Sequence, residues 1–303
     1  MLRTLALAAL LLVTALPVSA GFKDGVAAYE RGDYPTALRE FKPLAERGHA
    51  VAQYNLGLMY ALGRGVPKNQ REAVKWYRKA AVQGYAKAQL NLGLKYGAGL
   101  GVPKNYGEAI KWFRRAALQG YAKAQYNLGV MYEDGLGVPK NYGEAIKWYR
   151  KAALQGYATA QFNLGLMYDR GQGVPKNYGE AIKWYRKAAL QGYATAQFNL
   201  GLMYDRGQGV PKNHGEAIKW YRKAALQGYV GSQLNLGVMY GNGQGVPKNY
   251  VIAYFWWSLA AAAGNKKAAH YLEIIDKRMT PAQVAKAKAM AAKWKPKKAG
   301  PVK

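Results

Sequence analysis

The chain has 303 residues and a formal net charge of +29, from 45 lysines and arginines against 16 acidic residues. This excess indicates an acidic partner, and an anionic polymer, an anionic lipid surface and an acidic protein all satisfy it. Cysteine is absent, which excludes disulfides, thiolate metal sites and a catalytic thiol.

The first twenty residues have the features of a secretory signal peptide. Arg3 provides a basic start, an apolar run follows over residues 5–16, and small residues precede a cleavage site after Ala20. The run is shorter than a bilayer requires, which disfavours the alternative of an uncleaved membrane anchor. We therefore expect residues 1–20 to be removed and the protein to be exported, either to the periplasm or out of the cell.

Residues 21–49 read as a degenerate N-terminal capping repeat. Ala37 and Phe41 stand where Ala73 and Tyr77 stand in the first full unit. A stacked array needs such atypical end units to remain soluble.

A unit of 36 residues then recurs six times over residues 50–265. A period of this length predicts a stacked array of helical units, each of which buries its apolar face against its neighbours. Identical units build a long surface, whereas catalysis needs unlike residues that converge on one point. The recurrent prolines are Pro67, Pro103, Pro139, Pro175, Pro211 and Pro247.

Each unit is expected to hold two helices, such as Ala194–Arg206 and residues 213–227. Gly192 is placed to end the preceding helix as a C-cap. Asn213 and Glu216 have the spacing of a capping box at the start of the second helix.

The helix pattern also predicts how the units pack. Ile182 and Tyr185 lie on one face of a second helix, while Lys183 points outward. Gly165 lies in the middle of a first helix, where glycine is about 1 kcal/mol less favourable than alanine. Its recurrence predicts close approach to a large ring, and we expect that ring to be the tryptophan.

The C-terminal end departs from the pattern. Residues 266–294 read as capping helices, with Thr280 and Pro281 starting the last one, and residues 295–303 as a basic disordered tail. Phe255 and Leu259 replace cations of the earlier units. We expect the last helix to cover this apolar face, although a partner protein could cover it instead.

The motifs AQYNLGVMY at residues 124–132 and GLGVPKNYGEAIKWYRKAALQG at residues 135–156 resemble the Sel-1-like repeat family, a variant of the tetratricopeptide array. The resemblance extends over nearly the whole mature chain. It implies an all-α fold, a right-handed α-solenoid of tandem 36-residue helix-turn-helix repeats with degenerate capping units at both ends. It also implies adaptor or scaffold work without catalysis.

The first candidate binding surface is a ladder of cations on the outer face of the second helices. Neighbouring helices in a stack lie about 8–10 Å apart, so a multivalent anion could bridge several rungs. A solvated face tuned for solubility is the alternative, although a net charge of +3 per unit exceeds what solubility requires. The ladder consists of Lys75, Arg78, Lys111, Arg114, Lys147, Arg150, Lys183, Arg186, Lys219 and Arg222.

The second candidate is an inner groove lined by the first helices, which would take a protein or peptide. Its asparagines could hydrogen-bond an extended peptide, or they could brace the turn between helices. The groove candidates are Tyr126, Asn127, Phe162, Asn163, Phe198 and Asn199.

Catalytic and cofactor motifs are missing. His49 and His214 stand where other units have tyrosine, and neither Ser232 nor Ser258 begins an S-x-x-K motif. A β-lactamase-type hydrolase, an activity attached to some cysteine-rich relatives, is therefore only a remote alternative. We expect no cofactor and no metal, and export argues against nucleic acid as the partner.

Together these features favour a non-catalytic scaffold of the bacterial envelope or secreted space. Its groove would bind a protein or peptide, and its basic ladder an acidic partner. The alternative is a polyanion binder, for envelope polysaccharide, anionic lipid or nucleic acid, that acts through charge alone.

Overall fold

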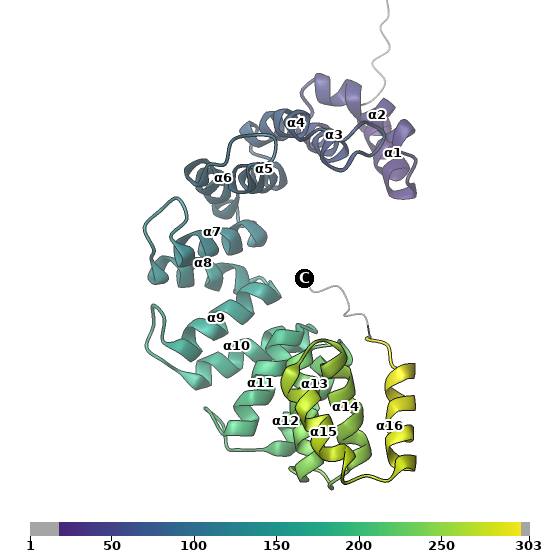
Figure 1. The fold of residues 1–303 in the computed structure, drawn as a ribbon. Helices are drawn as coiled ribbons and strands as arrows, with labels where there is room; N and C mark the ends of the chain where they lie inside the picture. Colours follow the sequence, from purple (N-terminus) through teal and green to yellow (C-terminus); the bar gives the residue numbers. More distant parts are fainter. Residues whose placement is uncertain (1–17, 298–303) are drawn as a thin grey trace, which may run out of the picture. The chain divides into compact units, whose positions relative to one another are not determined.

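The computed structural model describes residues 18–297, and every regular element in this range is an α-helix (Figure 1). The predicted all-α array of helix-turn-helix units is confirmed. The helices are α1 (Val18–Arg31), α2 (Tyr34–Glu46), α3 (Ala50–Leu62), α4 (Gln70–Val82), α5 (Ala86–Ala98), α6 (Tyr106–Leu118), α7 (Ala122–Asp134), α8 (Tyr142–Leu154), α9 (Ala158–Arg170), α10 (Tyr178–Leu190), α11 (Ala194–Arg206), α12 (His214–Leu226), α13 (Val230–Asn242), α14 (Tyr250–Ala262), α15 (Lys266–Asp276) and α16 (Pro281–Lys293).

Two compact units divide the chain after Gln119. Helices α1–α6 belong to the first unit and α7–α16 to the second. Within each unit successive helices pack against each other, except that α15 and α16 both pack against α14. Residues 1–17, which form most of the predicted signal peptide, and residues 298–303, which end the predicted tail, lie outside the described residues.

The helix ends follow the predicted cap chemistry with two differences. Asn213 caps α12, because its side-chain oxygen accepts a hydrogen bond from the Glu216 amide at 2.9 Å. The Glu216 carboxylate does not complete the expected capping box and instead accepts a hydrogen bond from Lys219 at 2.6 Å. The C-cap of α10 is Gln191, and Gly192 is the residue after it, at φ +89°.

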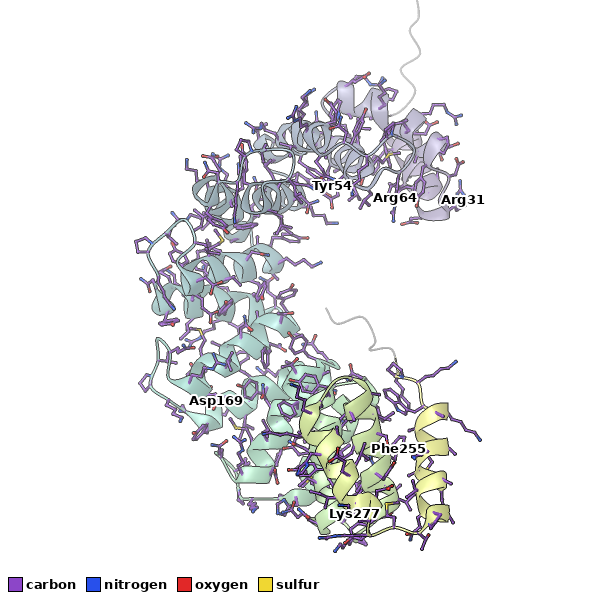
Figure 2. The ribbon with its side chains drawn as sticks, viewed as in Figure 1. Arg31, Tyr54, Arg64, Asp169, Phe255 and Lys277 are labelled. Atoms are coloured by element: carbon purple, nitrogen blue, oxygen red, sulfur yellow. The ribbon has the colours of Figure 1, made fainter. Side chains whose placement is uncertain are left out.

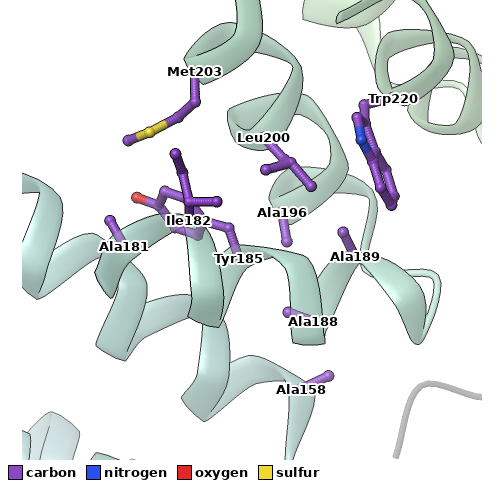
Figure 3. Close-up of a cluster of buried hydrophobic side chains, with 10 residues drawn as sticks. All are labelled: Ala158, Ala181, Ile182, Tyr185, Ala188, Ala189, Ala196, Leu200, Met203 and Trp220. Carbon is purple, nitrogen blue, oxygen red and sulfur yellow. The ribbon is translucent and has the colours of Figure 1, made fainter. Parts of the chain in front are cut away.

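The core consists of successive clusters, each shared by neighbouring repeats. Figure 3 shows one of them, in which Tyr185, Leu200 and Met203 pack among alanines of α9, α10 and α11. Trp220 of the following second helix closes this cluster. The alanines allow the helices to approach closely, and burial of each large side chain stabilises the stack by about 2 kcal/mol.

The recurrent mid-helix glycine marks a close approach to an aromatic ring, as predicted. The prediction that this ring belongs to the tryptophan is wrong, because the ring is that of the next residue, Tyr185 in the repeat of Gly165. A Cβ on Gly165 would lie 2.7 Å from Cδ1 of Tyr185, which no real Cβ tolerates. Trp184 is one residue earlier on α10 and therefore points about 100° away, into the cluster of the preceding repeat. Among the described residues, this mid-helix glycine lies against a tryptophan only in the last repeat, where Trp257 stands at the position that tyrosine holds in most other repeats.

A buried glutamine in the first helices α3, α5, α9 and α11 ties three helices together. Gln161 of α9 donates to the carbonyl of Ala153 at the end of α8, at 3.0 Å, and accepts from Gln191 at the end of α10, at 2.8 Å. These glutamines are not among the residues singled out in the sequence, although their period of 36 is visible there. The same side-chain bond to a preceding helix is made by Gln53, Gln89, Gln197 and Gln233.

The C-terminal helix covers the apolar face of α14. Met290 and Trp294 pack against the cluster that contains Phe255 and Trp256, so this face does not need a partner protein (Figures 1 and 2). Residues 295–297, predicted to begin a disordered tail, instead continue from this contact onto the end of α12.

Helix α5 contains a matched pair of glycines that tests the close approach. A Cβ on Gly93 would lie 2.6 Å from Cε1 of Phe113, whereas a Cβ on Gly97 would lie 3.9 Å from the nearest atom, on Ala109. We predict that Gly93→Ala lowers stability by about 1–3 kcal/mol through overpacking. Gly97→Ala should leave stability unchanged or raise it by up to about 1 kcal/mol. Urea denaturation followed by circular dichroism measures both, and equal midpoints would contradict the assignment.

Removal of the buried glutamine should uncouple neighbouring repeats. Gln161→Ala removes one of the two hydrogen bonds to the Ala153 carbonyl, which keeps the Gly156 amide at 3.1 Å, and it leaves a buried cavity, so we predict a loss of about 1–3 kcal/mol. Gln191→Ala removes only the partly exposed member of the pair and should have a smaller effect. A broader urea transition in Gln161→Ala alone would show loss of cooperativity between repeats, whereas identical curves for both variants would count against the bridge.

Candidate binding surface

The second helices carry the predicted basic ladder on an exposed face. Lys183 pairs with Glu180 at 2.6 Å, three residues earlier on α10, and the lysine side chain stays mostly exposed. The pair is a surface contact, and its contribution to stability is small, about 0.2–0.5 kcal/mol. The same pairing holds for Lys75, Lys111, Lys147 and Lys219.

Within each unit, arginines of the ladder join one repeat to the next. Arg150 of α8 donates to the hydroxyl of Tyr168, on the first helix of the following repeat, at 2.6 Å. This contact positions the guanidinium without neutralising it, because the tyrosine hydroxyl is uncharged. Arg78, Arg186 and Arg222 make the same hydrogen bond to Tyr96, Tyr204 and Tyr240.

A third cation lies over the tryptophan ring of the same helix in α4, α6, α8, α10 and α12. Lys187 Nζ is 4.3 Å from the ring centroid of Trp184, which is itself almost fully buried. Cation–π contact of this kind holds the charge against an apolar surface. Lys79, Arg115, Lys151 and Lys223 lie in the same way over Trp76, Trp112, Trp148 and Trp220.

These cations surround surface hollows that also have apolar walls. On α10 a hollow of about 360 Å³ is lined by Lys183, Arg186 and Lys187 together with Ile182 and Leu190. Equivalent hollows of about 610 and 630 Å³ lie on α4 and α12. The hollows on α10 and α12 each combine three positive charges and one carboxylate with aliphatic and indole surface, whereas the hollow on α4 combines four positive charges with valine side chains.

The structure brings three consecutive rungs together in the second unit, on α8, α10 and α12. The rungs of α4 and α6, with Lys75, Arg78, Lys111 and Arg114, belong to the first unit.

The predicted groove residues on the first helices serve packing to a large extent. The ring of Phe162 lies 5.6 Å from Tyr185 and 5.3 Å from Tyr193, both in its own repeat, and it packs against the cluster that contains Leu200 of the next repeat. Tyr126 is half-buried in the same way, against Tyr149 and Tyr157. Phe198 is half-buried against Tyr221 and Tyr229. These rings form part of the contacts between repeats and expose only part of their surface.

The groove asparagines differ in their contacts. Asn127 donates to the Lys123 carbonyl of its own helix at 2.7 Å. Asn163 and Asn199 are half-buried on α9 and α11. Burial and a hydrogen bond to Glu133 raise the pKa of Tyr149, so this hydroxyl stays protonated and acts as a structural donor.

The described residues hold no cluster of three or more histidine, cysteine or acidic side chains that could bind a metal ion. His214 bonds Asp205 at 2.9 Å, and His49 caps α3 through its ring nitrogen. Ser232 is fully buried, so its hydroxyl cannot meet a substrate. Within residues 18–297, no helix combines the length and the apolar character that crossing a membrane requires.

The geometry is that of a helical-repeat interaction protein, a chain whose units present the same surface several times. The Sel1 repeat model matches residues 50–85, 86–121, 122–157, 158–193, 194–229 and 230–265, and the chain belongs to this family. Proteins with Sel1 repeats are in general protein-interaction scaffolds and are typically non-catalytic.

Solved structures share this architecture. A protective antigen present in uropathogenic Escherichia coli strains is 36% identical, with a TM-score of 0.83, over 91% of this chain and 61% of that one. A Sel1 repeat protein from Oxalobacter formigenes is 38% identical, with a TM-score of 0.70, over 79% of this chain and 96% of that one.

Curated relatives match only a short stretch. An exopolysaccharide production negative regulator of Rhizobium meliloti (strain 1021) is 41% identical over 56 residues, which are 18% of this chain and 21% of the regulator. The DAP3-binding cell death enhancer 1 of Rattus norvegicus is 42% identical over 50 residues, which are 16% of this chain and 10% of that protein.

Proposed function

We propose that this chain is a non-catalytic scaffold that binds an acidic segment of a partner protein in the hollows of the basic ladder. The observation that carries the proposal is the repeated combination of three cations with isoleucine, tryptophan and leucine on α10 and α12. Carboxylates would pair with the cations, and apolar side chains of the partner would cover the aliphatic surface.

The apolar walls favour an acidic protein over a polyanion that binds through charge alone. Leu154 and Leu190 are 70% and 69% exposed in the ladder face. A polysaccharide would pair with the lysines and arginines but would leave these leucines in water. A protein segment can satisfy both parts of the hollow, which adds about 1.5–3 kcal/mol for each large apolar side chain that becomes fully buried.

The first-helix groove has a secondary role in this proposal. Its aromatic rings pack against the clusters that neighbouring repeats share, and Asn127 already bonds a carbonyl of its own helix. The groove therefore supports the spacing of the rungs and offers the partner fewer free groups than the ladder does.

Charge reversal on the ladder tests the proposal. We predict that Lys147→Glu, Arg150→Glu, Lys183→Glu and Arg186→Glu together weaken binding of a fluorescent peptide of alternating glutamate and tryptophan by about 100-fold or more. The matched control reverses Lys266, Lys267, Lys286 and Lys288, which are exposed on α15 and α16 and change the net charge equally.

Fluorescence anisotropy at about 0.15 M salt measures both variants. Equal weakening in the ladder variant and the control would show that only net charge matters. Binding of heparin and of tryptophan-free polyglutamate as tightly as the mixed peptide would favour the polyanion alternative.

We also propose that the mature protein is exported and begins at Gly21, on the basis of the basic start, the apolar run and the small residues before Ala20. Intact-mass spectrometry of the protein from a secreting bacterial host should give the mass of residues 21–303. An Ala20→Phe variant, with a large side chain next to the cleavage site, should be processed poorly. The full-length mass in the wild-type protein would contradict the proposal.

A further inference from the structure

The chain's own C-terminal segment occupies a site at the end of α12. The Lys297 amide donates to the carbonyl of Leu226 at 2.8 Å. Trp294 packs in the same cluster as Leu226, and a Cβ on Gly228 would lie 3.7 Å from Cβ of Pro296. Residues 294–297 therefore lie across the last turn of α12, with an aromatic anchor followed by a proline two positions later.

The equivalent places at the ends of α10 and α8 are exposed. Leu190 and Leu154 are about 70% exposed, whereas Leu226 is partly buried. A Cβ on Gly192 or Gly156 would meet nothing within 4 Å. No hydrogen bond to the carbonyl oxygens of Leu154 and Leu190 is found among the residues that the structure describes.

The open places have the same local build as the occupied one. Helices α8 and α10 share the sequence YGEAIKWYRKAAL, and α12 differs only at its first residue, His214. Trp220 contacts the end of α10 in its cluster, as Trp256 contacts the end of α12. An apolar contact surface and a backbone carbonyl acceptor are thus present at the ends of α8, α10 and α12.

The surroundings differ in charge. In the repeat alignment, Phe255 and Leu259, near the occupied place, correspond to Lys219 and Lys223 near Leu190. Near Leu154, the residues that correspond to Phe255 and Leu259 are Lys183 and Lys187. A lysine-rich segment like residues 293–297 is repelled at these two places, which argues against the tail of a second copy as the occupant.

We propose that the ends of α8 and α10, at Leu154 and Leu190, bind an extended segment of a partner protein that carries an aromatic residue, then a proline two positions later, with carboxylates where this chain has Lys295 and Lys297. The aromatic side chain packs on the exposed leucine, as Trp294 does near Leu226. Proline keeps the segment extended and lies against the glycine, where no side chain intervenes.

This inference rests on the proposed function and names its partner chemistry. It also gives the C-terminal segment a role. The segment covers the end of α12, where the flanking residues Phe255 and Leu259 are apolar, unlike the cations beside Leu154 and Leu190.

The test uses residues 21–303 and a fluorescent peptide with the core Glu-Trp-Glu-Pro-Glu. We expect binding to fall by about 30-fold when alanine replaces the peptide's tryptophan, as for loss of an interface anchor. Leu154→Asp with Leu190→Asp should cause a similar loss. These leucines are exposed, so the substitutions leave the fold intact, which circular dichroism checks.

The matched control is Leu62→Asp with Leu94→Asp, two exposed leucines of first helices with the same change in charge. This control should bind the peptide within about twofold of the wild-type protein, as surface changes outside an interface do. Equal loss in the control, or retained binding in the Leu154/Leu190 variant, would overturn the inference.

The two proposals fail in different ways. If the tryptophan-free peptide binds as tightly as the original and ladder charge reversal abolishes both, the ladder function stands and the aromatic–proline site is wrong. If ladder charge reversal leaves binding of both peptides unchanged, the ladder function fails as well.

Discussion

The structure depends on the buried glutamine that bridges three helices. Gln161 donates to the end of α8 and accepts from the end of α10, so each first helix is fixed between two second helices. A buried amide tolerates no other partner geometry without a penalty of about 1–3 kcal/mol. Within each unit this bridge, which recurs at Gln53, Gln89 and Gln197, sets the relation between successive second helices and hence the spacing of the ladder that they carry.

The ladder follows from that spacing. Each rung holds its cations in place through different contacts, a carboxylate for Lys183, a tyrosine hydroxyl for Arg186 and an indole ring for Lys187. None of these contacts removes the net positive charge of the rung. A preorganised cation loses less entropy on binding than a free one, so the surface is suited to an acidic partner even though each contact is weak by itself.

Most of the fold is predictable from the sequence because the period exposes it. The helix pairs, the asparagine caps and the outward cations all recur with one spacing, and the structure places them as expected. Three features lay beyond sequence reasoning. Trp184 and Tyr185 are adjacent aromatics, so only their angular positions reveal which one meets Gly165. The burial of Gln161 depends on three helices from two repeats, and the contact of Lys297 with Leu226 depends on where α16 ends.

Hydrogen exchange with the Glu-Trp-Glu-Pro-Glu peptide bound tests the central claim most directly, namely that the second helices carry the binding surface. The account predicts slower amide exchange in the last turns of α8 and α10 and in the turns after them, around Gly156 and Gly192. Exchange in the first helices α7, α9 and α11 should stay unchanged. Protection confined to those first helices, around Tyr126, Phe162 and Phe198, would place binding in the groove and contradict the account.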